Sequence, residues 1–352
     1  MTAPTPAAAP AAPLLEVKDL SVTYRTAAGP ARAVDGIALV IHAGETVGLV
    51  GESGCGKSVT SLALLRLVDP DGHVALGSSV RLEGRELLAL PGKEMRQVRG
   101  NHVAIVFQEP ATALNPVLTI GDQVAEVVRT HHKVAAAEAW RRAVEMLELV
   151  GIPDAAPAAH HYPHQLSGGM RQRALIAMAL VCHPKLLIAD EPTTALDVTI
   201  QAEILELLTD LQRRFGMAVL LITHNLGIVA ETTQRTYVMY AGEIVEEAPT
   251  PALFAAPAHP YTEGLLAAVP RLDAPQGRLT AIPGQVPPAT AWPAGCRFHP
   301  RCAWAWERCA AEHPPLLEAA PGHTARCWLL AEPGRRAATS TAEAGGSRGA
   351  GA

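Results

Sequence analysis

Eight residues in the first part of the chain constrain its fold more than any other segment. Residues 51–58, GESGCGKS, match the pattern G-x-x-x-x-G-K-[ST] at every position. Such a loop binds phosphate between a strand and a helix, because the helix N-terminus adds positive charge to the backbone N–H groups of the loop. The apolar run Thr46–Val50 precedes the loop, and the pattern over Ser58–Val68 is helical. The sequence therefore predicts a phosphate-binding strand–loop–helix unit.

Individual loop residues have separate roles in binding a nucleoside triphosphate. Lys57 is placed to contact the β- and γ-phosphates, and the Ser58 hydroxyl to bind Mg²⁺. The glycines let the backbone close around the phosphate oxygens. The residues that we expect to contact the nucleotide in this segment are Gly51, Ser53, Gly54, Cys55, Gly56, Lys57, Ser58 and Val59.

Two carboxylates follow another predicted strand. Leu186–Ala189 is entirely apolar, as is typical of a strand buried on both faces of a parallel sheet, and Asp190 and Glu191 come directly after it. These side chains should lie at the carboxyl edge of the sheet, where ligands bind. We expect Asp190 to be the acid on the Mg²⁺ side and Glu191 to polarise an attacking water.

A second segment has the features of an anion site. Ser167, Gly168 and Gly169 precede the apolar helical run Ala174–Cys182, so a hydroxyl, backbone amides and a helix N-terminus would converge there. An enzyme with one phosphate site needs only one such element, so the pair of elements needs a different explanation.

The two segments resemble the phosphate loop and the signature motif of ATP-binding cassette (ABC) ATPases. Further residues match that family in its order: Tyr24 where an aromatic ring stacks on adenine, Gln108 in the Q-loop, Asp197 in the D-loop (Ala195-Leu196-Asp197) and His224 as the switch histidine. Taken singly, Tyr24 could be an ordinary strand tyrosine and His224 a structural histidine.

The resemblance implies roles for these residues. Glu191, His224 and Gln108 would be catalytic, and Mg²⁺ would be held by Ser58, Gln108 and Asp190. The signature residues Ser167, Gly168 and Gly169 would act on the ATP of the partner subunit. The chain would then be an ATP hydrolase whose site is completed only in a dimer.

Longer stretches narrow the resemblance. Residues 51–60, 107–116 and 165–173 are similar to the D-type ATPase subunit of oligopeptide/dipeptide importers. Val59 and Met170 favour this type, because the F-type sister subunit usually has Thr and Gln at these positions. The resemblance covers roughly residues 14–330.

The importer resemblance implies several partners. These are the F-type ATPase as the second half of a heterodimer, two membrane permeases and, indirectly, an extracytoplasmic substrate-binding protein. The subunit would be peripheral, at the cytoplasmic face of the inner membrane. The cargo could instead be nickel, glutathione, murein peptides or a glycoside, and the dimer could be homomeric. Whether the opposite half-site hydrolyses ATP also stays open.

The same resemblance implies the fold and its divisions. We expect an α/β P-loop domain of the ABC type, with a RecA-like core, an antiparallel β subdomain and a helical subdomain that contacts the permeases. The divisions are a disordered lead at 1–13, the ATPase domain at 14–255 with the helical subdomain at about 110–165, a C-terminal extension at 256–330 and a disordered tail at 331–352. A helix is predicted over Val134–Val150.

Four cysteines lie close together in the extension. Cys296, Cys302, Cys309 and Cys327 have the spacing C-x5-C-x6-C-x17-C. Disulfides are disfavoured in the cytosol, so clustered thiols suggest a metal site. The spacing lacks the C-x2-C pairs of zinc ribbons and differs from ferredoxin runs, although four cysteines are what an iron–sulfur cluster needs. The resemblance implies a [4Fe–4S] cluster, as in some members of the family, with zinc or no metal as alternatives.

The extension also contains four of the five tryptophans, which we expect to form a small apolar core. They are Trp292, Trp304, Trp306 and Trp328.

Composition excludes two broad classes of protein. The net charge is −5 and charged residues make up 18%, which does not suit a general nucleic-acid binder. The longest apolar run, Ala174–Cys182, is far shorter than the ~20 residues of a membrane helix. Met1–Pro13 has no positive side chain and does not resemble a signal peptide, so we expect a cytosolic protein.

Two rival functions have weaker support. A soluble ABC ATPase of DNA repair or translation usually has two cassettes or a long coiled-coil insertion, and only residues 109–165 separate Gln108 from the signature. A module that binds nucleotide without turnover would not need Glu191.

Overall fold

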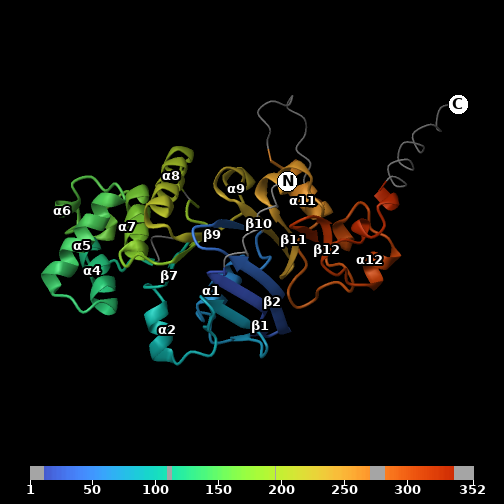
Figure 1. The fold of residues 1–352 in the computed structure, drawn as a ribbon, viewed down its shortest axis with the longest axis horizontal. Coiled ribbons are helices and arrows are strands. Elements are labelled where there is room, and N and C mark those ends of the chain that lie inside the picture. The colour runs from blue at the N-terminus through green and yellow to red at the C-terminus, as the bar shows by residue number, and fades with distance from the viewer. Residues whose placement is uncertain (1–11, 109–112, 195, 270–281, 337–352) are drawn as a thin grey trace, which may run out of the picture.

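The computed structural model describes residues 12–108, 113–194, 196–269 and 282–336. Most of the predicted lead and tail lies outside these ranges, as do Glu109, Pro110 and Ala195. The first residues of the predicted tail are described, and there Glu332 pairs with Arg308 at 2.9 Å. Figure 1 shows a helical region at one end, two sheets in the middle and the C-terminal extension at the other end.

The smaller sheet is antiparallel and forms the predicted β subdomain. Two long strands, β1 (Leu15–Thr26) and β2 (Gly29–Ile41), pair along most of their length. Strand β1 is continuous because irregularities in its pairing with β2, one of them at Asp19 with φ +50°, bend it without ending it. The other strands are β4 (Gly72–Val74), β5 (Ser79–Leu82) and β6 (Arg85–Glu86).

The larger sheet has the strand order β12-β13-β11-β10-β3-β9-β8-β7. Five neighbouring strands, from β10 to β7, are parallel, and the remaining pairs are antiparallel. The strands are β3 (Thr46–Val50), β7 (Val103–Val106), β8 (Leu186–Asp190), β9 (Ala218–Thr223), β10 (Arg235–Tyr240), β11 (Glu243–Pro249), β12 (Leu317–Ala320) and β13 (His323–Ala325). All residues of β8 and β9 are buried, which explains why both strands are apolar up to their last residues, Asp190 and Thr223.

The helices agree with the predicted pattern in most places. Residues 134–150 form α5 (Ala136–Leu149), as expected. Helix α1 (Lys57–Leu64) is shorter than predicted, because the chain leaves the helix at Leu65 and Arg66 has φ +53°. The others are α2 (Gly92–Val98), α4 (Ile120–His131), α6 (Ala155–Ala158), α7 (Gly168–Leu180), α8 (Val198–Phe215), α9 (Leu226–Thr232), α10 (Thr250–Ala255), α11 (Pro260–Ala267) and α12 (Glu307–Ala311). No helix within the described ranges is long and apolar enough to cross a membrane.

The C-terminal extension is attached to the central sheet. Strand β13 pairs with β11, and β12 pairs with β13, so the extension adds two strands to the sheet. Glu246 on β11 is fully buried and accepts hydrogen bonds from the backbone of Ala258 and His259 and from His323 Nε2 at 2.7 Å. A buried carboxylate is stable only when it is paired, so this network ties α11 and β13 to the sheet.

Candidate functional site

The phosphate loop connects β3 to α1 as the sequence predicts. Two of its glycines, Gly51 and Gly56, are required by the close approach of neighbouring backbone. A Cβ at Gly51 would lie 2.2 Å from the carbonyl oxygen of Met239, and one at Gly56, where φ is +112°, would lie 2.5 Å from that of Ala33. Any other residue at either position would collide with backbone that cannot easily move.

Lys57 points back into the loop that it follows. Its ammonium donates to the carbonyl oxygens of Gly51 at 2.8 Å and Glu52 at 3.0 Å, and the residue is only 6% exposed. These two carbonyl oxygens thus hold the positive charge of Lys57 beside the loop, where a phosphate group would bind.

Asp190 faces the first turn of α1. Its two carboxylate oxygens accept hydrogen bonds from Ser58 Oγ at 3.3 Å and from Ser61 Oγ at 3.2 Å. Burial raises the pKa of Asp190 above its usual value, although the two serine hydroxyls act in the opposite direction. Ser58 and Asp190, the two oxygen ligands that the sequence predicts for Mg²⁺, therefore lie within hydrogen-bond distance of each other.

Glu191 lies at the centre of a hydrogen-bonded group. Its oxygens accept from Gln108 Nε2 at 3.1 Å and from Thr194 Oγ1 at 2.8 Å, and His224 Nδ1 lies 3.1 Å away. Burial alone would raise the pKa of Glu191, but the hydrogen bonds from His224 and Thr194 lower it. The carboxylate thus stays ionised at neutral pH, the form that can accept a proton from water.

Backbone geometry aims Glu191 away from its strand. The residue has φ +48°, a left-handed conformation that costs energy for a residue with a side chain. Its backbone N–H donates to Ile222 on β9 at 2.9 Å, which holds the turn in place. The strain therefore coincides with the one residue whose carboxylate contacts Gln108, Thr194 and His224.

The signature residues form a second, separate site. Ser167 caps α7, its Oγ accepting from the N–H of Met170 at 3.3 Å, and both Ser167 and Gly168 are exposed. A Cβ at Gly169 would lie 3.0 Å from Ile200 in α8, close to Asp197, which caps that helix. Within the described ranges, no hydrogen bond or ion pair joins Ser167–Gly169 to the phosphate loop.

Tyr24 lies on β1, opposite Gly72 on β4. The residue is half-buried, and burial together with the negative charge of Asp69 raises the pKa of its hydroxyl. A Cβ at Gly72 would lie 2.8 Å from Cε1 of the ring, so one side of the ring lies against β4.

The four cysteines of the extension line one apolar cavity. All are free thiols, and the same cavity is lined by Trp304, Trp306 and Trp328. Trp292 does not line the cavity, but it packs against the same apolar cluster as Cys296 and Cys302, with Arg297 stacked 3.6 Å from its ring centre. Three of the four tryptophans therefore line the cavity itself, and the fourth packs against the adjoining apolar cluster.

Three properties of the cavity bear on metal binding: the protonation of its thiols, the arrangement of its possible ligands and its free space. Burial raises the pKa of Cys296 and Cys327 to about 12 and that of Cys302 to about 11, so these thiols are neutral at pH 7 unless a cation displaces their protons. Among the described residues, no three His, Cys, Asp or Glu side chains converge to hold a single metal ion. The free space is about 10 Å³, so a larger group would require the residues that line the cavity to move apart.

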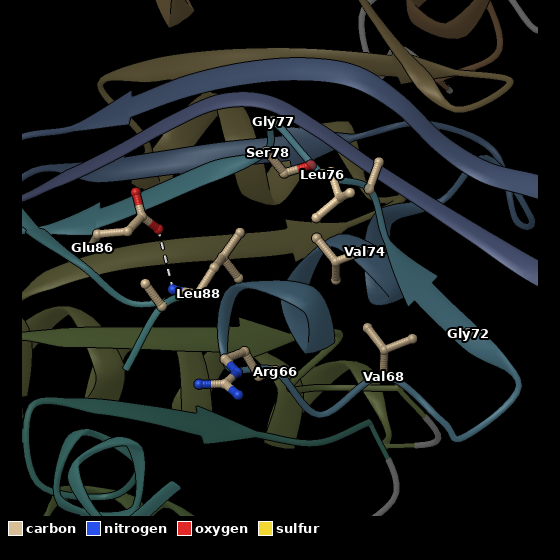
Figure 2. A pocket seen from close by; sticks show the side chains of 11 residues that line it. Arg66, Val68, Gly72, Val74, Leu76, Gly77, Ser78, Glu86 and Leu88 are labelled. Atoms are coloured by element: carbon tan, nitrogen blue, oxygen red, sulfur yellow. Dashed lines mark hydrogen bonds between the residues drawn. The ribbon is translucent and has the colours of Figure 1, made fainter. Parts of the chain in front are cut away.

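Another hollow, of about 520 Å³, lies between the end of α1 and the β4–β5 segment (Figure 2). Arg66 and Glu86 lie at its wall, and Glu86 accepts from the N–H of Leu88 at 3.1 Å. None of the predicted site residues lines it, so its size does not make it the site of nucleotide chemistry.

Several contacts in the site were not predicted from the sequence. Ser61 is one helical turn after Ser58, and this spacing could have indicated a second hydroxyl facing Asp190. Thr194 follows Glu191 by three residues, which gave a weaker signal. Tyr261 and Arg301 both contact Glu52, and no local pattern could have indicated contacts over 209 and 249 residues.

Two family models match separate parts of the chain. The family described as ABC transporter matches residues 34–194, and the one described as oligopeptide/dipeptide transporter, C-terminal region, matches residues 245–309. The first range includes the phosphate loop, the signature residues and Glu191. The second includes three of the four clustered cysteines.

Similar proteins share both parts. A probable peptide ABC transporter ATP-binding protein of Sinorhizobium fredii is 52% identical over 316 residues, covering 90% of this chain and 94% of that protein. The oligopeptide transport ATP-binding protein AppD of Bacillus subtilis is 50% identical over 321 residues, covering 91% of this chain and 98% of AppD.

Solved structures share the fold. The dimeric ATP-binding cassette MJ0796, in a post-hydrolysis state bound to ADP and Pi, has a TM-score of 0.60 and 28% identity, and covers 67% of this chain and 98% of that cassette. The likeness confirms the α/β P-loop fold that the sequence predicted.

The two loop glycines with different surroundings allow a matched test of the site geometry. Gly56→Ala should lower the free energy of unfolding by about 3 kcal/mol or more and abolish ATP binding, because the new Cβ collides with the backbone at Ala33. Gly54→Ala, at φ +80° with open space around it, should cost only about 1–2 kcal/mol. Urea denaturation measures both, and equal losses in the two variants would contradict the steric explanation.

Proposed function

The chain belongs to the ATP-binding proteins of ABC transporters, and we propose that it is the ATP-hydrolysing subunit of an importer of di- or oligopeptides. The observation that carries the hydrolytic role is the position of Glu191, ionised, at the end of β8 and in contact with Gln108, Thr194 and His224. A module that only binds nucleotide would not require this arrangement.

The proposed roles follow from the geometry of the site. The loop amides and Lys57 bind the β- and γ-phosphates, while Ser58 and Asp190, with Gln108, hold Mg²⁺. The metal ion supplies positive charge that neutralises the phosphate oxygens. Glu191 accepts a proton from the attacking water, and His224, whose side chain is 64% exposed beside it, contacts the γ-phosphate.

Two further roles, stacking on adenine and contact with the ATP of the opposite subunit, fall to residues at the surface of the chain. Tyr24 stacks on adenine with the side of its ring that does not lie against β4. Ser167, Gly168 and Gly169 contact the ATP of the opposite subunit, with Asp197 beside them. The exposed, separate position of the signature residues supports this division, because they do not complete the loop of their own chain.

The proposal that the cargo is a peptide rests on the family match of the C-terminal part of the chain and on the names of the similar proteins. Residues 245–309 match the C-terminal region of oligopeptide/dipeptide transporters, and the similar proteins are named for peptide transport. Nickel, glutathione or another solute is the alternative cargo within the same machine. We also retain the predicted division into an ATPase domain at 14–255 and an extension at 256–330.

The proposed assembly contains four chains besides the extracytoplasmic binding protein. This subunit pairs with a second, F-type ATPase, and the two dock on two permeases at the cytoplasmic face of the inner membrane. Residues 110–165 include most of the helical region and contact the permeases. No nucleic acid takes part.

Purification of the tagged subunit from detergent-solubilised membranes tests the assembly. We expect two permeases and a second ATPase to be recovered in equal amounts with it. Recovery of DNA or ribosomes in place of permeases would contradict the importer function. Recovery of permeases with a homodimer of this chain would contradict the F-type partner but not the importer function.

Substitution of the proposed base tests the hydrolytic role. In the purified complex, Glu191→Gln should lower the ATPase rate contributed by this half-site by about 100-fold or more, with ATP binding retained, because the amide cannot accept the proton of water. Glu318→Gln, on the exposed strand β12, is the matched control and should have no effect. An unchanged rate in Glu191→Gln would exclude the carboxylate as the base.

We further propose that the four clustered cysteines hold a [4Fe–4S] cluster. Four thiols on one apolar cavity supply the ligand set of such a cluster. Among the described residues, no three such side chains are arranged to hold a single metal ion, and the free space is about 10 Å³, so the lining of the cavity would have to move apart to admit the cluster.

Metal analysis of anaerobically purified protein decides between the alternatives. We expect about four irons per chain, with broad visible absorption, and loss of both in Cys302→Ser. Cys182→Ser, a buried cysteine at the end of α7 and outside the cavity, should retain the iron. Stoichiometric zinc, or metal-free protein with full stability, would contradict the cluster.

A further inference from the structure

Glu52, the second residue of the phosphate loop, is held by two residues of the C-terminal extension. Its backbone N–H donates to the hydroxyl of Tyr261 on α11 at 2.8 Å. Its carboxylate accepts two parallel hydrogen bonds from Arg301, with Nη1–Oε2 at 2.7 Å and Nη2–Oε1 at 3.0 Å. The extension thus fixes both the main chain and the side chain of one loop residue.

The Arg301 side chain is itself held firmly. It is only 6% exposed, whereas that of Glu52 is 27% exposed. Arg301 also donates to the carbonyl of Pro283 at 2.7 Å and lies near the hydroxyl of Tyr240 at 3.4 Å. Burial alone would lower the pKa of the guanidinium, but its hydrogen bonds to Glu52 and Tyr240 raise it, so the guanidinium stays charged. A bidentate pair of this kind fixes direction as well as charge.

The pair bears directly on the loop that binds phosphate. The carbonyl oxygens of Gly51 and Glu52 accept the hydrogen bonds of Lys57, so a shift of Glu52 would move the lysine. The carboxylate of Glu52 is also a negative charge in a loop whose ligand is a polyanion. Without a paired cation, it would repel that ligand.

We propose that Arg301 is a positioning residue for ATP, which acts through Glu52 by neutralising its carboxylate beside the bound phosphates. The C-terminal extension is then part of the nucleotide site and not an appendage to it. The inference rests on ATP binding, which is common to the family, and not on the proposed cargo, partners or metal cluster.

A charge cycle tests the proposal with the full-length chain. The dissociation constant of ATP–Mg²⁺ is measured by equilibrium titration at low and high salt. Arg301→Met should weaken binding by about 5-fold, because it leaves Glu52 unpaired beside the triphosphate. Glu52→Gln should tighten binding, because it removes a negative charge from the phosphate loop while the positive charge of Arg301 stays. The double variant should lie within about 2-fold of the original chain, and the difference between Arg301→Met and the original should shrink at high salt.

A matched arginine separates this role from support of the extension. Arg308→Met removes a guanidinium that stacks on Trp328 and pairs with Glu312 and Glu332, all within the extension. It should leave ATP affinity unchanged.

Two results would overturn the proposal. One is unchanged affinity in Arg301→Met. The other is a double variant as weak as Arg301→Met, since loss of charge at Glu52 would then bring no recovery. If Arg301→Met does not fold, Glu52→Gln decides: equal or weaker binding in that variant would overturn the proposal as well.

Discussion

The parallel pairing of three strands, β3, β9 and β8, determines the rest of the site. Val50 lies opposite Thr223, and Ile222 lies opposite Asp190, so all three strands end at one level. The phosphate loop, the two carboxylates and His224 each follow directly from one of these ends. A shift of one residue along this ladder would move Asp190 away from Ser58 and His224 away from Glu191.

The buried strands are also what the sequence made easiest to predict. Strands that are buried on both faces must be apolar throughout, and Thr46–Val50 and Leu186–Ala189 are short apolar runs that end in loop or acidic residues. The order of the motifs along the chain then placed Gln108, Asp190, Glu191 and His224, and the structure brings them into two connected groups of hydrogen bonds. The two strands were predictable because local pattern and position in the sheet carry the same information.

Contacts made across the chain were not predictable in this way. The pairing of β13 with β11, the buried Glu246–His323 contact and the hold of Tyr261 and Arg301 on Glu52 depend on tertiary packing between distant segments. The early end of α1 depends on the left-handed backbone at Arg66, for which the sequence has no glycine as a signal. The extension looked like a separate small domain because its Pro- and Cys-rich composition differs from that of the cassette, although it completes the edge of the same sheet.

We propose that the phosphate loop and the signature of this chain face different partner subunits, so that ATP hydrolysis is coupled to association with other chains. Uptake into proteoliposomes tests this central claim most directly, with the complete transporter reconstituted and ATP supplied on the side of this subunit. The account predicts accumulation of a labelled dipeptide or oligopeptide above its external concentration, dependent on ATP and on an intact Glu191. Accumulation without ATP, or ATP-driven uptake of nickel or another solute with no peptide transport, would contradict it.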